Sequence, residues 1–416
     1  MAEYSEARPV RDWQETFPWL ILFRAVRVAI GFRLLLLAAL GLVGMVAGWR
    51  LCWNMLAYVP DEAGIQVLAD PVLMELGTRH EGTVPPWPWE ASYRHFGDQG
   101  VLAPLSGLPY IGPILGTATA TAAELTLPFQ MLFRQDLTYR GFAYALVCCG
   151  WALVIWGYFG GMIARIVAVK LTQDEMLSFK KAGRFARQRC CSYMSAPLLP
   201  LLGIFGLGIP VALLGLLANL DFGVFVAGIL WPIVLCLGFL MMILFLGLLF
   251  GWPLMFSTIS TEGTDAFDAI SRSYAYVFQR PFHYLFYALL ATIIGSLGWV
   301  LLHGIIDLIV YSTHWSLAWG LSSERTIELF YGDLQEGLAG WGCHLIRFWQ
   351  GFLYTLTTAF AVGFLFSGMT AIYLLLRRCV DGVELDEVQL DQETQYGLPV
   401  LSGSEGVPAE DSTANS

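Results

Sequence analysis

Residues 221–262 read DFGVFVAGILWPIVLCLGFLMMILFLGLLFGWPLMFSTISTE, and the 40 residues between Asp221 and Glu262 contain no Asp, Glu, Lys or Arg. The hydrocarbon core of a bilayer is about 30 Å thick, and a helix needs about 20 apolar residues to cross it. Soluble cores do not require uncharged runs of this length. Further runs of the same kind occur along the chain, so the sequence predicts an all-α, polytopic membrane helix bundle.

The composition agrees with this class. Hydrophobic residues make up 56% of the 416 residues and charged residues only 13%, whereas an average soluble domain is roughly 25% charged. The net charge of −10 argues against nucleic acid as a partner, because phosphate backbones attract basic surfaces.

Six transmembrane helices are expected. They lie at about residues 34–53, 142–163, 197–220, 222–251, 282–302 and 348–376. Only a tight turn at Asn219-Leu220-Asp221 separates the third from the fourth, so these two form a helical hairpin. Forty helical residues rise about 60 Å, twice the membrane thickness, so we expect the fourth helix to break at Gly251-Trp252-Pro253.

Basic residues orient the spans. They lie before the first span, between the second and third, between the fourth and fifth, and after the sixth, whereas the alternate connections are poor in Lys and Arg. The positive-inside rule then places both termini in the cytoplasm. The expected units are a cytoplasmic segment with an interfacial helix (1–33), a six-span domain (34–379) with an outer insertion (54–140), and an acidic, disordered tail (380–416).

A weak repeat precedes the odd-numbered spans. A capping box at Thr172–Glu175 predicts a helix from Asp174 to Arg189. One face of this helix carries Met176, Phe179, Ala182, Gly183, Ala186 and Cys190, and the other carries Lys180, Lys181, Arg184 and Arg187. A second amphipathic helix is expected from Asp265 to Phe278, with an apolar face of Phe267, Ile270, Tyr274, Val277 and Phe278. The predicted plan is an interfacial helix, a span, an outer connection and a returning span, used three times as helical hairpins.

Three segments carry a resemblance to known proteins: residues 268–274 (DAISRSY), the helix at 179–190, and residues 373–384 (YLLLRRCVDGVE). They resemble the six-span membrane domain attached to some glycerophosphodiester phosphodiesterases, and the end of uncharacterised multi-pass proteins of planctomycete bacteria. The resemblance implies a membrane architecture in the inner membrane of a bacterium. It carries no active-site residues, because the phosphodiesterase catalytic domain is absent from this sequence.

One polar group on the fifth and sixth helices is a candidate site. His303 and Asp307 are spaced i, i+4, so their side chains can meet on one helix face, and His344 is the third member of this speculative cluster. Ionisable pairs inside a membrane often mark proton or ion pathways. The alternative is that both residues sit at the outer interface, because the span that begins at Phe282 reaches that surface before them.

Small residues at four-residue spacing predict close helix packing. They are Gly44, Gly48, Gly157, Gly161, Ala359, Gly363 and Ser367. Packing inside the bundle is the favoured interpretation, and a dimer seam is the alternative.

No motif fixes a reaction, a metal or a cofactor. His80, Glu81, Glu90, His95 and Asp98 in the outer insertion match no metal-binding spacing. We therefore expect a non-catalytic accessory, membrane-organising or transport-related protein, with the bilayer, anionic lipids or another membrane protein as partner. The alternative is a membrane-embedded enzyme on lipid substrates, which would bring His303, Asp307 and His344 together in a cleft.

Overall fold

The computed structural model describes residues 17–56, 58–60, 66–68, 129–134, 138–322, 325 and 337–383. Within them, six helices are long and apolar enough to cross a membrane, so the chain is a multi-pass membrane protein. They are α3 (Phe32–Leu56), α7 (Tyr139–Gln173), α9 (Cys190–Leu217), α10 (Asp221–Glu262), α12 (Pro281–Ala318) and α14 (Gly337–Asp381). Each overlaps one of the six expected spans.

The shorter elements connect these helices. They are η1 (Pro18–Leu20), α2 (Ile21–Ala29), α8 (Phe179–Gln188), α11 (Ala266–Gln279) and the antiparallel strands β1 (Tyr58–Pro60) and β2 (Gln66–Leu68). Most of the outer insertion 54–140, including His80, Glu81, Glu90, His95 and Asp98, and the acidic tail beyond residue 383 lie outside the described residues.

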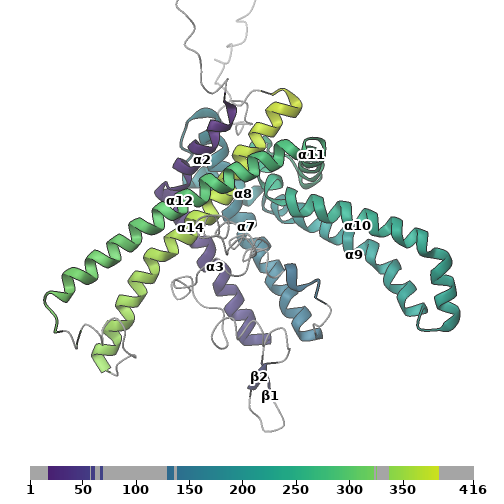
Figure 1. Ribbon diagram of the computed structural model, residues 1–416, viewed down its shortest axis with the longest axis horizontal. Coiled ribbons are helices and arrows are strands. Elements are labelled where there is room, and N and C mark those ends of the chain that lie inside the picture. Colours follow the sequence, from purple (N-terminus) through teal and green to yellow (C-terminus); the bar gives the residue numbers. More distant parts are fainter. Residues whose placement is uncertain are drawn as a thin grey trace, which may run out of the picture.

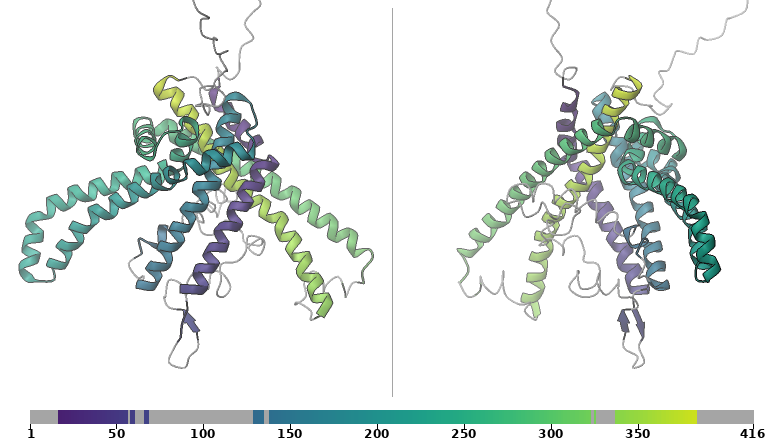
Figure 2. Two further views of the ribbon diagram at one scale, coloured as in Figure 1. Left: turned by 180° about the vertical axis from the view of Figure 1, so that it is seen from behind. Right: turned by 45° about the vertical axis from the view of Figure 1, so that its right-hand side comes forward.

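The long helices lie in three antiparallel pairs, α3 with α7, α9 with α10, and α12 with α14 (Figure 1). The pairs diverge from one common end, which also carries α2, α8, α11 and the last turns of α14 (Figure 2). We call this end the junction. The described chain both begins and ends at the junction.

Helix α10 is unbroken, so the predicted break at residues 251–253 is wrong. It runs 42 residues with Pro232 and Pro253 inside it. Two features replace the break. The α9–α10 pair runs obliquely away from the junction (Figure 1), and a tilted helix accommodates extra length. Pro253 lies inside the helix beside the Ser257 hydroxyl, which donates to the Pro253 carbonyl oxygen (3.2 Å); membrane helices tolerate an internal proline because local adjustments and neighbouring groups satisfy the backbone. The predicted turn between α9 and α10 is present at residues 218–220.

Aromatic packing at the junction centres on Phe366 of α14. Its ring lies 5.9 Å from that of Trp156 and 5.5 Å from that of Phe256. Gly160 of α7 permits this approach, since a Cβ there would lie 2.7 Å from the Phe366 ring. Three elements distant in sequence, α7, α10 and α14, therefore meet at one side chain.

The connection between α7 and α8 differs from the predicted capping box. Thr172 and Gln173 still belong to α7, and Asp174 ends it in a left-handed conformation at φ 57°. The Nζ of Lys170 lies 3.0 Å from the Asp174 carboxylate, and Arg24 lies 3.4 Å from it. The hydrogen bond and charge of Lys170, assisted by Arg24, lower the pKa of Asp174. This tether is therefore present at neutral pH and lost as the pH falls through that lowered pKa.

Helix α8 begins at Phe179, five residues later than the predicted start at Asp174, with Ser178 as its N-cap. Met176 lies outside the helix and is 47% exposed, and Phe179 is 38% exposed. Of the predicted face, Ala182 and Ala186 are buried, and Phe185 is buried with them in place of Phe179. This difference follows from Arg165 of α7, whose guanidinium carbon lies 4.2 Å from the Phe185 ring centre and orients the helix through a cation–π contact.

Helix α11 buries part of the predicted apolar face, because Val277 is buried and Ile270 and Tyr274 pack against the core. Its buried residues are Ala266, Ala269, Ser273, Tyr276 and Val277. Phe267 and Phe278 are exposed. The small residues Ala266, Ala269 and Ser273 allow close contact with neighbouring helices, and the Tyr276 ring is buried beside them. Asp265 caps the helix and accepts a hydrogen bond from the amide of Asp268 (3.0 Å).

The buried face of α8 generates a test of its docking. Phe185→Ala removes a ring that is 6% exposed, so we expect it to lower the free energy of unfolding by about 3 kcal/mol. Phe179→Ala, on the same helix, should cost less than about 1 kcal/mol because its ring is largely accessible. Equilibrium unfolding of both variants in detergent micelles measures the difference. Equal losses would show that α8 is not held by Phe185.

Candidate functional site

A stripe of side chains on α12 faces α14. It comprises Thr292, Ser296, Trp299, His303 and Asp307, and their spacing of three or four residues places them on one helix face. On α14, Ala361, Leu365 and Gly368 follow the same rule, and Tyr354 lies seven residues, or about two turns, before Ala361. The two stripes face each other with a pocket between part of them, and we call this stretch of the α12–α14 pair the groove.

A polar cluster occupies the part of this groove farther from the junction. The Tyr354 hydroxyl donates to Asp307 Oδ1 (2.7 Å), and His303 Nε2 lies 3.5 Å from Asp307 Oδ2. The His303 ring stacks on Trp299 with ring centres 4.6 Å apart, and it lies 5.4 Å from the Tyr354 ring. The Asp307 carboxylate thus lies beside His303 of α12 and Tyr354 of α14, and Trp299 stacks on the His303 ring.

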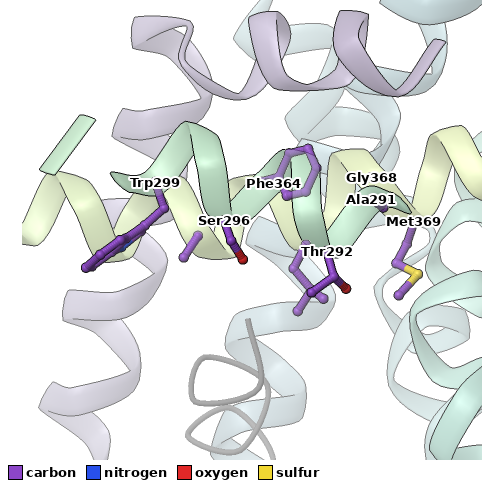
Figure 3. A pocket seen from close by; sticks show the side chains of 10 residues that line it. Ala291, Thr292, Ser296, Trp299, Phe364, Gly368 and Met369 are labelled. Carbon is purple, nitrogen blue, oxygen red and sulfur yellow. The ribbon is translucent and has the colours of Figure 1, made fainter. Parts of the chain in front are cut away.

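An apolar pocket continues from this cluster toward the junction. It has a volume of about 70 Å³ and is lined mainly by Ala291, Gly295, Trp299, Phe364 and Met369, together with Thr292 and Ser296. Figure 3 shows Thr292, Ser296 and Trp299 projecting to one side of α12, with Phe364 and Met369 contributed by α14. Trp299 belongs to both the pocket and the polar cluster, so the two form one site.

The third predicted member, His344, does not join the other two. It is exposed on α14 and lies ten residues, or about 15 Å along the helix, before Tyr354. Tyr354, and not His344, is the α14 residue that contacts Asp307. The sequence analysis missed Tyr354 because only the register between α12 and α14 pairs it with Asp307. Farther from the junction, Gln350 of α14 contacts His314 of α12.

The histidine geometry limits its chemistry. A general base needs one ring nitrogen for the substrate and the other for an orienting group. Here Nε2 faces Asp307, and Nδ1 is buried without a hydrogen-bond partner. Neither nitrogen is presented to the groove, so the cluster is better suited to binding than to proton transfer from a substrate.

A second polar network lies at the junction, outside the candidate site. The Glu262 carboxylate, 10% exposed, lies 2.6 Å from Arg272 Nη1 and 3.2 Å from Arg377 Nε. The Tyr373 hydroxyl donates to the same carboxylate (2.6 Å). Arg272 also donates to both oxygens of Asp268, at 3.2 and 3.1 Å. Segments 268–274 and 373–384, singled out in the sequence, therefore meet around one acidic residue.

Two features extend this network. Burial lowers the pKa of the Arg272 guanidinium, but its hydrogen bond to Asp268 and the charges of Glu262 and Asp268 outweigh burial and raise it above its usual value. The Tyr276 hydroxyl donates to the Asp381 carboxylate. The network thus joins the ends of α10 and α14 to α11, and its role is to hold helices together.

Arg165 is the buried charge that the sequence analysis missed. It is 2% exposed, and its Nη1 donates to the Ser260 carbonyl oxygen (2.7 Å). The Ser260 hydroxyl is 2.7 Å from the Tyr193 hydroxyl. Arg165 therefore connects α7 to α10 and α8, and α9 joins through Tyr193. A single Arg near the end of an apolar run gave no sign of this in the sequence.

The predicted packing residues lie between helices. A Cβ at Gly48 would overlap Trp151, and one at Gly161 would lie 2.7 Å from the Tyr193 ring. Gly44 faces Ile155, Gly157 faces Met194, and Gly363 faces Ala38. Ala359 and Ser367 are fully buried. Six of these seven positions are buried and Gly44 is half-buried.

The four basic residues predicted for the membrane surface, Lys180, Lys181, Arg184 and Arg187, are exposed on α8 opposite its buried face. Among the described residues, no group of three His, Cys, Asp or Glu side chains is placed to hold a metal ion.

No family model, curated protein or solved structure matches this chain. Its function is therefore argued from the geometry alone.

The Glu262 network generates a stability test. Glu262→Gln leaves the charges of Arg272 and Arg377 facing each other without the carboxylate. We expect a loss of about 3 kcal/mol, at the low end for breaking a buried pair, because Arg272 is more than a third exposed. Glu175→Gln, an exposed residue of the α7–α8 connection, is the control. Equilibrium unfolding in detergent measures both variants. An equal loss of unfolding free energy in the two would show that the Glu262 network does not hold the helices together.

Proposed function

We propose that this protein is a non-catalytic organising component of its membrane, which holds another membrane protein through the α9–α10 hairpin. One observation carries the proposal. In their most apolar 18-residue windows, α7 and α14 are 78% buried inside the protein, whereas α9 is 17% and α10 only 6% buried. The chain thus contains a packed unit and a hairpin attached to it mainly by one end.

The surface of the hairpin favours a protein partner over lipid alone. Gly206 and Gly215 on α9, and Gly228 and Gly238 on α10, have open space where a Cβ would lie. Without a hydrophobic driving force between helices, membrane proteins associate through small residues that allow backbones to approach closely. The exposed glycines therefore offer sites for helices from a second protein.

The arrangement also favours organisation over transport. Transporters commonly place their sites on helices that are broken near the middle of the membrane. The six long helices described here are continuous. We further propose that the chain is a threefold repeat of hairpins, with α2, α8 and α11 as the interfacial helices. The two complete connections, α7–α8–α9 and α10–α11–α12, share a left-handed residue followed by a side-chain N-cap.

We propose the inner membrane of a bacterium as the location, with the junction on the cytoplasmic side. The basic face of α8 supports this orientation through the positive-inside rule. At that surface its four basic residues would each gain about 1 kcal/mol from anionic lipids.

Cross-linking from the hairpin tests the organising role. A photoreactive residue at positions 235, 239 or 242, which share one exposed face of α10, should give an adduct with the same membrane protein from all three positions. Position 163, fully buried in α7, is the control and should give none. Adducts with lipid alone at every α10 position would contradict the proposal.

The alternative is a membrane-embedded enzyme acting on lipids, and the His303–Asp307 pair is the observation that favours it. It requires a rearrangement that frees a ring nitrogen of His303. Turnover of lipids by the purified protein in vesicles, abolished by His303→Gln, would establish this alternative in place of the organising role.

A further inference from the structure

We propose that the α12–α14 groove binds one lipid molecule with a cationic amine headgroup. The amine contacts Asp307 and Tyr354, and an acyl chain lies along Trp299 into the pocket beyond it. This inference goes beyond the organising role and rests on different helices.

The charge of the polar cluster selects a cation. Asp307 is half-exposed, and its partners are the Tyr354 hydroxyl and His303. In the described part of the chain no Lys or Arg side chain contacts it. An ionised carboxylate accepts about four hydrogen bonds, so Asp307 retains capacity for a further donor. An ammonium group supplies both the donor and the opposite charge.

The aromatic rings around Asp307 favour the same ligand. Ammonium groups bind the faces of aromatic rings through cation–π attraction, which strengthens where water is excluded. The Tyr354 ring lies beside the carboxylate, 5.4 Å from the His303 ring. An anionic headgroup would instead meet a carboxylate and the negative face of the tyrosine.

The depth of the cluster fits a headgroup. Asp307 lies 26 residues beyond Pro281, where α12 leaves the junction, which is about 39 Å along the axis. The hydrocarbon core is about 30 Å thick, so α12 brings Asp307 to the headgroup layer on the far side at any tilt up to about 40° from the membrane normal. A lipid of that leaflet extends its chains back toward the middle of the membrane.

The groove supplies the place for such a chain. From Asp307 the stripe on α12 turns apolar at Trp299 and continues to Ala291, 16 residues away. Gly295 and Gly368 line the pocket, and Gly295 makes room for the Phe364 ring, since a Cβ there would lie 2.1 Å from it (Figure 3). The order along the groove, carboxylate first and apolar pocket second, matches the order of headgroup and chain in a lipid of the far leaflet.

The test uses the full-length protein and two lipids with identical chains, phosphatidylethanolamine and phosphatidylglycerol. Native mass spectrometry of wild-type protein from nanodiscs containing both should show retention of phosphatidylethanolamine over phosphatidylglycerol by about tenfold, or about 1.4 kcal/mol. Asp307→Asn should reduce this ratio to near one. Asp221→Asn, a carboxylate at the same far end of the protein in the first turn of α10, should leave it unchanged.

Two results would overturn the inference. One is equal retention of both lipids by the wild-type protein, a measurement that depends on no variant. The other is a preference that survives Asp307→Asn in protein with the wild-type unfolding temperature. Neither result bears on the α10 cross-links, so the organising role is judged separately.

Discussion

The structure depends on the burial of one carboxylate where the membrane helices converge. Glu262 at the end of α10 meets Arg272 of α11 and both Arg377 and Tyr373 of α14. A buried charge is costly unless it is paired and hydrogen-bonded, so these helix ends must stay together for any of the groups to be satisfied. Arg165 imposes a similar constraint on α7, α9 and α10 through Ser260 and Tyr193.

Concentrating the polar contacts at the junction leaves the far ends of the hairpins with few ties to one another. Each hairpin is stabilised within its own pair of helices: α3 and α7 pack through Gly44 and Gly48, and α12 and α14 through Tyr354 and Asp307. Because lipid chains are as apolar as Leu, no hydrophobic force draws the hairpins together. They can therefore diverge, and α9–α10 reaches farthest from the packed centre.

The α12–α14 pair shows how one contact can serve both folding and binding. Hydrogen bonds between helices in a membrane contribute about 0.6 kcal/mol on average, so the Tyr354–Asp307 bond adds only modest stability to the hairpin. The same bond fixes the carboxylate at the edge of the groove. The pairing that assembles the hairpin thus also orients the group that a cationic ligand would meet.

The membrane class, six helices and their approximate places follow from the sequence alone, because uncharged runs such as 222–261 have no other stable environment than a bilayer. The helix face shared by His303 and Asp307, and the packing positions of Gly48 and Gly161, also follow from helical periodicity. The tertiary structure determined three features that helical periodicity does not specify. It continued α10 through Pro253, because an oblique helix accommodates the length that sequence rules divide at a break. It turned α8 so that Phe185 rather than Phe179 is buried, because Arg165 lies on the neighbouring helix. It placed Tyr354 rather than His344 beside Asp307. The register between α12 and α14 depends on all of their contacts together and is not encoded at any single position.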